Sequence, residues 1–253
     1  MNYRITGTGS CIPDITKKNS DFLENKFLDS DGGKFQTSNS EIIDKFNSIT
    51  GIYERRYAPD EINCSDLAAV AAGLAINDSK LDQETLDYII VAHNTGDISC
   101  SSGQVDTLPS VASKVKAKLK IKNPNCVAYD IICGCPGWVE GIIQAKSFIK
   151  SGMAEKCLVI GCDTLSRILD ENDRDSMIYA DGSGAIVLES DNSYDGGILS
   201  HKSATFTYDG ENDFIFYGAS YDIKKRTQSD QKFIKMQGRK VYEFALKNVP
   251  VAM

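Results

Sequence analysis

The chain has 253 residues, of which 42% are hydrophobic and 25% charged, so it is long enough to bury one large core or two smaller ones. Its 28 basic and 35 acidic residues give a formal net charge of -7, which argues against general binding to nucleic acids or anionic membranes, because both need a basic surface. The sequence contains neither an apolar signal core nor an apolar run long enough to cross a bilayer, so we expect a cytoplasmic protein.

Eight cysteines are spread along the chain. In a short secreted protein they would indicate a disulfide framework, but this chain is long and has no export signal, so we expect reduced thiols. Cys126, Cys157 and Cys162 lie in strand-like runs and are predicted to be small core residues. Cys133 and Cys135 form a C-x-C pair without a second pair at zinc spacing or a nearby histidine, so no metal site is expected.

Apolar runs of strand length alternate with helical patterns through the middle of the chain. Ser65 and Asp66 are expected to cap an alanine-rich helix over residues 67–76 that is completely buried. The elements predicted after it are a strand at 86–92, a helix at 108–119, a strand at 126–132, a helix at 139–149 and a strand at 156–161. This alternation predicts an α/β fold with a largely parallel sheet that helices cover on both faces.

Cys135 stands where the predicted strand at 126–132 turns into the predicted helix at 139–149, which Gly152 is expected to end. Pro136 suits the first helical position, because its missing N–H is not needed there. The positive end of a helix dipole favours a negatively charged sulfur, the form that acts as a nucleophile. Cys135 is therefore the candidate nucleophile.

The pattern changes after residues 181–184, Asp-Gly-Ser-Gly, which we expect to form a tight turn near Cys135. Consecutive strands are predicted at 185–189 and 197–207, joined by a hairpin-like connection at 192–196. A change from alternating strands and helices to consecutive strands favours a domain boundary, and we place it in this connection.

The predicted division gives a first half of residues 1–191, which carries the nucleophile, and the beginning of a second half at 192–253. A helix is expected over 234–246. The sequence stops before the strands that such a second half would need to close its core, so we expect the second half to be truncated.

Six short motifs follow one another in an order and spacing that are specific when taken together. They are Ile5–Ser10 with Pro13, Thr50–Arg56, Asp130–Gly137, Leu158–Gly161, Asp170–Arg174 and Asp181–Ala185. The set covers nearly the whole chain and resembles the β-ketoacyl-acyl-carrier-protein synthase III family of condensing enzymes. This resemblance implies the layered α/β/α/β/α thiolase-like fold, with the second half incomplete in this chain.

The resemblance also implies an acyltransferase. Cys135 would take an acyl group from a thioester, and malonyl-acyl-carrier protein would lose carbon dioxide to give a carbanion that attacks the acyl-enzyme. The product would be a β-ketoacyl thioester for fatty-acid, related lipid or polyketide synthesis. The implied partners are acyl-carrier protein and a second copy of the chain in a homodimer, and no cofactor is expected. The family's decarboxylating histidine and asparagine lie beyond this sequence, so we expect it to acylate better than it condenses.

Two positions bear on the acyl donor through the same resemblance. Lys45 and Ile49 stand where the bacterial type members place a tryptophan and an arginine that hold coenzyme A. Acyl-carrier protein and acyl-coenzyme A therefore both stay open as donors. Arg174 matches the family's other nucleotide-side arginine, and a salt bridge to Asp170 or Asp173 is the alternative reading.

Three further residues are expected at the acyl pocket. Leu108 matches the position where a residue donated across the dimer closes the pocket, and a leucine in place of the usual phenylalanine indicates an acyl group other than acetyl. Trp138 and Tyr179 are expected to line or back the same pocket, with simple core packing as the alternative.

Individual residues bear on three alternative functions. The Gly7-Thr8-Gly9 pair does not indicate dinucleotide binding, because Ile12 occupies the third glycine position. A cysteine hydrolase of another fold would need His93 or His201 within hydrogen-bond reach of Cys135, and both are predicted to be structural or surface residues. A non-catalytic, truncated partner that dimerises but does not condense is the remaining alternative.

Overall fold

The computed structural model describes residues 2–252, which form two compact units that interleave along the chain. Unit 1 consists of the residues up to 15 together with 56–167 and 180–200. Unit 2 consists of 16–55, 168–179 and the residues from 201 on. Each unit combines segments from early and late in the chain, so the two units are not separated at one position of the sequence. The predicted boundary between residues 191 and 192 stays a prediction.

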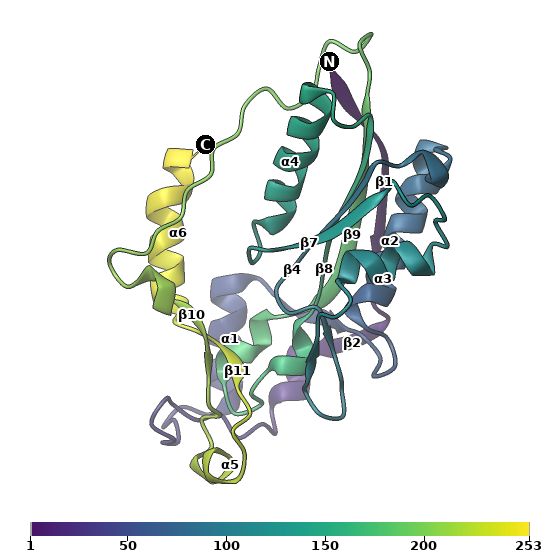
Figure 1. Ribbon diagram of the computed structural model, residues 1–253. Helices are drawn as coiled ribbons and strands as arrows, with labels where there is room; N and C mark the ends of the chain where they lie inside the picture. The colour runs from purple at the N-terminus through teal and green to yellow at the C-terminus, as the bar shows by residue number, and fades with distance from the viewer. Residues whose placement is uncertain (1, 253) are drawn as a thin grey trace. The chain divides into compact units, whose positions relative to one another are not determined.

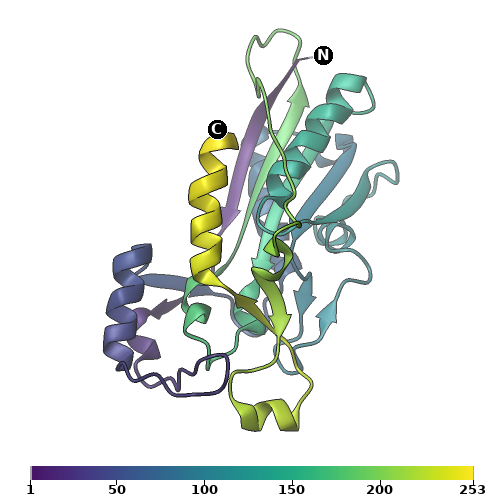
Figure 2. The same cartoon turned by 90° about the vertical axis from the view of Figure 1, so that its left-hand side faces the viewer.

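Unit 1 is built on a five-stranded mixed sheet in the order β1-β9-β8-β4-β7. The strands are β1 (Tyr3–Cys11), β4 (Tyr88–His93), β7 (Val127–Ile132), β8 (Lys156–Thr164) and β9 (Asp181–Ser190). β7 and β8 run parallel to β4, whereas β9 is antiparallel to both β8 and β1. The two long strands β1 and β9 lie side by side in Figure 2. The parallel sheet expected from the sequence is therefore confirmed for β8, β4 and β7 only.

Helices cover both faces of this sheet, as predicted. α2 (Cys64–Ser79) and α3 (Val111–Lys118) pack on one face, and α4 (Gly137–Ser151) packs on the other (Figure 1). Gly7 and Gly9 permit the contact between β1 and α2, since a Cβ on either would lie 2.1 or 2.2 Å from a carbonyl oxygen of the helix. These glycines therefore serve close packing of backbone on backbone.

Helix α2 differs from its prediction in two respects. Its N-cap is Asn63, whose backbone amide donates to the Asp66 carboxylate at 2.8 Å, so Ser65 is not the capping residue. Four alanines of the helix are fully buried, but Val70 and Leu74 are about half exposed. The predicted complete burial was wrong, because only one side of the helix faces the sheet.

Unit 1 also contains the short antiparallel pair β5 (Asp97–Ile98) and β6 (Val105–Asp106). Two 3-10 helices, Gln83–Thr85 and Leu165–Ile168, complete its regular structure among the described residues. Gly152 ends α4 in the left-handed conformation with φ of 77°, as the sequence predicted.

Unit 2 has a smaller apolar core, formed by Phe22, Phe27, Ile42, Ile43 and Met177. Its helices are α1 (Asn39–Thr50), α5 (Ile223–Gln228) and α6 (Gly238–Ala252), and its antiparallel pair is β10 (Ile215–Gly218) with β11 (Phe233–Met236). The 3-10 helices Asn19–Phe22, Arg174–Ile178 and Glu211–Asp213 also belong to unit 2, whereas the pair β2 (Ile15–Lys18) and β3 (Glu54–Tyr57) has residues in both units. The predicted helix at 234–246 begins only at Gly238, since residues 234–236 belong to β11.

Two further predictions were wrong. Residues 181–184 do not form a turn but open strand β9, where all four pair with β8 and the last two also pair with β1. Residues 197–207 form no strand, and Leu199 is 94% exposed there. A strand needs a neighbouring edge for its backbone hydrogen bonds, and local β-propensity does not supply one.

Candidate active site

Cys135 lies in the turn between β7 and α4. Gly134 has a left-handed backbone with φ of 63°, which glycine adopts without a steric penalty, and the amide of Gly137 donates to its carbonyl at 3.0 Å. Pro136 is the N-cap of α4. The Cys135 side chain is exposed, and among the described residues its backbone amide donates no hydrogen bond. The thiol is therefore accessible from outside the turn, and the amide is not used by the hydrogen bonds of the described backbone.

A cavity of about 300 Å³ opens at this turn and lies within unit 1. Its wall comprises Cys135 and Trp138, the ends of β4 and β8, and the opening residues of β9: Ala92, Gly161, Cys162, Asp163, Gly182, Ser183 and Gly184. Gly161 allows Trp138 to lie close over β8, since a Cβ there would be 3.2 Å from the indole ring. Trp138 and Cys135 line the same cavity, and the part of Trp138 in an acyl pocket stays a prediction.

Asp163 is the charged group of the cavity wall. It accepts hydrogen bonds from the Asn94 backbone amide at 2.9 Å and from the Asn94 side-chain amide at 2.6 Å. Burial raises the pKa of Asp163. The Asn94 carboxamide oxygen lies 3.7 Å from the point where a Cβ on Gly134 would stand, so the Asp163–Asn94 pair supports the loop next to the Cys135 turn.

His93 is paired with Asp130 at the carboxyl ends of the neighbouring strands β4 and β7, with 3.0 Å between Nε2 and the carboxylate. Asp130 also accepts from the amides of Val111 and Ala112 at the start of α3, at 2.7 and 2.8 Å. Burial raises the pKa of Asp130, but the His93 and backbone hydrogen bonds outweigh it and lower the pKa overall. This pair connects α3 to the strand that precedes Cys135.

Neither histidine is placed as a base for Cys135 by a hydrogen bond in the described part of the chain. His93 is buried against Asp130, whereas His201 is exposed in a segment without regular structure. This arrangement fits the structural and surface roles predicted for them and gives no support to the hydrolase alternative.

The remaining residues expected at the acyl pocket are distributed over both units. Leu108, in unit 1, is 87% exposed. Arg174 and Tyr179 belong to unit 2, where Tyr179 is half-buried and the Arg174 guanidinium lies 4.6 Å from the centre of the Phe35 ring. Their contribution to the acyl pocket stays a prediction.

The alternative reading of Arg174 as a salt-bridge residue was wrong. Within residues 2–252, Asp170 and Asp173 form their ion pairs with Lys235, at 2.6 and 3.2 Å. Lys235 is more than 60 positions away in the sequence, so the residues around Arg174 do not indicate this pairing. The Arg174 guanidinium instead lies over the ring of Phe35.

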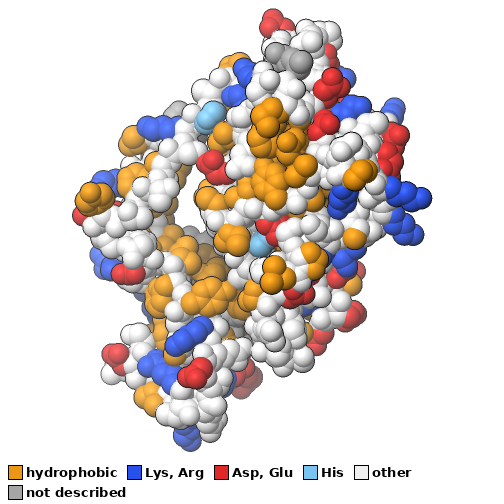
Figure 3. Space-filling view, viewed as in Figure 1, with side chains coloured by type: hydrophobic (Ala, Val, Ile, Leu, Met, Phe, Trp, Pro, Cys, Tyr) orange, Lys and Arg blue, Asp and Glu red, His pale blue; other side chains and the backbone are white. Residues whose placement is uncertain are grey.

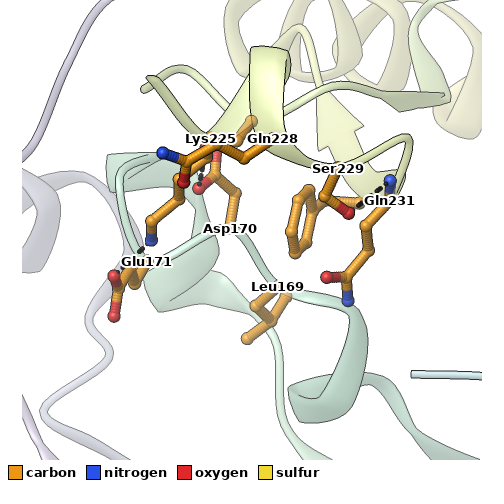
Figure 4. Close-up of a pocket in the computed structure, with 9 residues that line it drawn as sticks. Leu169, Asp170, Glu171, Lys225, Gln228, Ser229 and Gln231 are labelled. Carbon is orange, nitrogen blue, oxygen red and sulfur yellow. Dashed lines mark hydrogen bonds and ion pairs between the residues drawn. The ribbon is translucent and has the colours of Figure 1, made fainter. Parts of the chain in front are cut away.

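A second cavity, of about 390 Å³, lies within unit 2 (Figure 4). Its wall includes Asp170, Glu171 and Lys225, together with polar side chains of α5 and the following loop. Lys225 is paired with Glu171, and Asp170 is paired with Lys235. Because these charges already neutralise one another, this cavity does not offer an ionic ligand a free counter-charge.

Sequence reasoning missed Asp163 in the wall of the Cys135 cavity and Asn94 as its hydrogen-bond partner, although it expected residues 181–184 near Cys135. Asp163 follows the predicted strand at 156–161 and Asn94 follows that at 86–92, and polar residues at the carboxyl ends of adjacent parallel strands are a usable signal. No group of three or more histidine, cysteine or acidic side chains suited to a metal ion occurs in residues 2–252. Nor does any helix in that range have the length and apolar character needed to cross a membrane.

Comparisons with known proteins agree on one family. The family model described as 3-oxoacyl-[acyl-carrier-protein (ACP)] synthase III matches residues 129–206. The chain is 36% identical over 249 residues to the β-ketoacyl-[acyl-carrier-protein] synthase III of Neisseria gonorrhoeae strain NCCP11945, which covers 98% of this chain and 69% of that relative. It is also 36% identical over 248 residues to β-ketoacyl-[acyl-carrier-protein] synthase III 1 of Vibrio vulnificus, with 97% and 68% covered.

Comparison with solved structures also identifies enzymes of this family. The 3-oxoacyl-(acyl carrier protein) synthase III of Pseudomonas aeruginosa PAO1 superposes with a TM-score of 0.73 at 26% identity, covering 96% of this chain and 67% of that one. The enzyme of the same name from Aquifex aeolicus VF5 has a TM-score of 0.67 at 30% identity, with the same coverage. The priming β-ketosynthase of the R1128 polyketide pathway, at 19% identity and a TM-score of 0.76, shares the fold. The chain spans about two thirds of the length of these proteins.

Proposed function

Because the chain belongs to the β-ketoacyl-acyl-carrier-protein synthase III family of condensing acyltransferases, we propose that Cys135 accepts an acyl group from a thioester and presents it for condensation with malonyl-acyl-carrier protein. The observation that carries this proposal is the exposed Cys135 thiol at the N-terminus of α4, beside a cavity large enough to admit part of an acyl chain. The product is a β-ketoacyl thioester of fatty-acid biosynthesis.

The acyl-transfer step follows from the geometry of the turn. The Cys135 thiolate attacks the thioester carbonyl, and the tetrahedral intermediate expels the thiol of the donor. Its oxyanion needs N–H donors, and the Cys135 amide, which is not used by the backbone, supplies the first of them. The positive end of the α4 dipole stabilises both the thiolate and the oxyanion.

Asn94 and Asp163 have a positioning role in this proposal. Their two hydrogen bonds join the residue that follows β4 to the end of β8, next to the loop that carries Gly134 and Cys135. A turn that must present both a sulfur and an amide to one carbonyl requires such support, because small displacements of a catalytic group cost large factors in rate.

The acyl donor is proposed to be an acyl-carrier-protein thioester in preference to acyl-coenzyme A. Lys45 and Ile49 are both exposed on α1, and neither offers the aromatic face and guanidinium that the type members place there for coenzyme A. Arg174 is exposed and stacked on Phe35, so it is available to a phosphate of either donor. Acyl-carrier protein is thus a partner as donor and as malonyl carrier.

A homodimer formed through the β7 edge is part of the proposal. β7 is an edge strand of the unit 1 sheet, and edge strands with unpaired backbone groups favour pairing with a second copy. Apolar side chains gather over α4 and β7 in Figure 3, and Val127, Ile132 and Val139 are 46%, 70% and 48% exposed. In such a dimer the exposed Leu108 would be available to the acyl pocket of the partner. A cytoplasmic setting, which keeps Cys135 reduced, completes the proposal.

The test is the intact mass of the purified chain before and after exposure to acetyl-coenzyme A and, separately, to an acyl-carrier-protein thioester. One acyl adduct that maps to Cys135 supports the proposal, and the faster donor identifies the carrier. The absence of an adduct from either donor, with Cys135 still alkylated by iodoacetamide, would contradict it.

A further inference from the structure

Two buried cysteines of unit 1 are in direct contact through their sulfurs. Cys64 is in the first turn of α2 and Cys162 is near the end of β8, 98 positions apart in the sequence, and their Sγ atoms lie 2.9 Å apart. Both are buried, at 0% and 4% exposure, and both belong to the core between α2 and the sheet. The other buried cysteines, Cys126 and Cys157, have no such sulfur partner among the described residues.

The position of this pair connects it to the Cys135 cavity. Cys162 is one of the residues that line the cavity, and it immediately precedes Asp163, which holds Asn94. The sulfur pair therefore lies in the core between the sheet and α2, next in the chain to the Asp163–Asn94 pair.

We propose that Cys64 and Cys162 form a reversible disulfide when the protein is exposed to a peroxide, and that this bond braces α2 against β8 behind the Cys135 cavity. The inference goes beyond the condensing activity, since acyl transfer does not require either sulfur. The contact between α2 and β8 already exists in the reduced protein, so closing the bond requires only the last part of the approach of the two sulfurs.

The reaction balances with hydrogen peroxide as the oxidant. The Cys162 thiolate attacks one oxygen of the peroxide, the O–O bond breaks, and Cys162 becomes a sulfenic acid while the leaving hydroxide takes a proton to form water. The Cys64 sulfur then attacks the sulfenic sulfur, and the departing hydroxide takes the Cys64 proton to form a second water. Two thiols are oxidised by two electrons, and the peroxide is reduced.

Burial and the contact between the two thiols also determine how the rate of disulfide formation depends on pH. The hydrogen bond with Cys162 and then burial raise the pKa of the Cys64 thiol. Cys64 therefore holds its proton at neutral pH and must lose it when it attacks in the second, resolving step. Disulfide formation is expected to be faster at pH 8.5 than at pH 7.

Peptide mapping of the oxidised full-length chain tests the proposal. The protein is treated with hydrogen peroxide, its free thiols are alkylated, and it is digested with trypsin without reduction. Tryptic peptide 57–80 contains Cys64 alone, whereas peptide 157–167 contains both Cys157 and Cys162. The expected product is a cross-link between these two peptides that fragmentation assigns to Cys162 and that dithiothreitol reverses.

Two variants make the assignment independent of fragmentation. Cys157→Ala leaves Cys162 as the one thiol of peptide 157–167 and is expected to keep the cross-link. Cys64→Ser is expected to lose it and to accumulate sulfenic or sulfinic acid at Cys162. In the wild-type chain, oxidation is expected to raise the melting temperature of unit 1 on the order of 5–10 °C, because the bond closes a long loop.

Three outcomes would overturn the proposal. They are recovery of Cys64 and Cys162 as alkylated thiols after the exposed cysteines have been oxidised, a cross-link from Cys162 to Cys133 or Cys135, and a cross-link that persists in Cys64→Ser. The mapping on the wild-type chain decides the question even if a variant does not fold. Acylation of Cys135 is measured separately on reduced protein, so failure of one proposal is distinguishable from failure of the other.

Discussion

The two units of this protein stabilise their interiors in different ways. Unit 1 packs aliphatic side chains between its sheet and helices in two continuous clusters, and the buried residues are mostly alanine, valine, leucine and isoleucine. Unit 2 has a small aromatic and aliphatic core and, in addition, a buried ionic cluster of Lys235 with Asp170 and Asp173. Lys235 is 1% exposed, and its ammonium also lies 3.5 Å from the centre of the Tyr221 ring.

The difference shows where local sequence patterns are informative. Apolar burial is roughly proportional to area and is written into the sequence as periodicity, so the elements of unit 1 could be predicted. A buried ion pair stabilises only if all its partners are in place, and those partners come from distant segments. The candidate nucleophile Cys135 lies on the predictable unit, at a turn between two of its elements.

The largest effect is expected at the nucleophile of unit 1. Cys135→Ala should reduce acyl transfer by at least about 10³-fold, because the sulfur that forms the acyl-enzyme is absent. Cys133→Ala is the matched control and should retain most of the activity. Single-turnover acylation followed by mass spectrometry measures both, and the reverse ranking would assign the chemistry to Cys133.

The next effect concerns the ionic cluster of unit 2. Lys235→Met should lower the free energy of unfolding of unit 2 by about 3–5 kcal/mol, because two carboxylates are left buried without their counter-charge. Lys225→Met removes an exposed ion pair with Glu171 and should cost at most about 1 kcal/mol.

Hydrogen exchange of the β11 amides measures the stability of unit 2, whereas fluorescence of Trp138, the single tryptophan of the sequence, reports unit 1. If Lys235→Met lowers the free energy of unfolding of both units equally, the two units unfold together. That result would contradict an effect on unit 2 alone.

A smaller effect tests the packing of unit 1. Gly141→Ala should cost about 1–3 kcal/mol, because its Cβ would lie 2.8 Å from a methyl carbon of Val159. Gly73→Ala, on α2, is the control: its Cβ would be 3.8 Å from the nearest atom, and alanine favours a helix by roughly 0.5–1 kcal/mol. Urea denaturation followed by Trp138 fluorescence compares them, and equal destabilisation would show that this interface is not tightly packed.

The last effect is a dependence of the stability of unit 2 on pH, and it concerns the carboxyl group of Asp175. Burial raises its pKa to about 6. The folded state thus holds a proton that the unfolded state has lost between about pH 4 and 6, and this group's contribution to stability falls as pH rises through that window. Asp175→Asn should be more stable than the wild type by about 3 kcal/mol at pH 7 and equal to it near pH 3.5. A constant difference across pH would contradict this assignment.

Prediction from the sequence succeeded where the relevant interactions are local. The strand, turn and helix around Cys135 were predicted, as were β4, β8 and the glycine that ends α4, because each follows from apolar periodicity and capping within about 15 residues. The predicted strand at 197–207 failed, because a strand requires an edge that only the assembled sheet provides.

The sequence by itself therefore determined the strand, turn and helix that carry Cys135, the candidate nucleophile, and the family of the chain. The tertiary structure alone decided which distant groups surround these elements: Asp163 against Asn94, His93 against Asp130, and Cys64 against Cys162. The physical reason is that hydrogen bonds and sulfur contacts act over a few ångströms in space, whereas sequence patterns record only the periodicity of neighbouring residues.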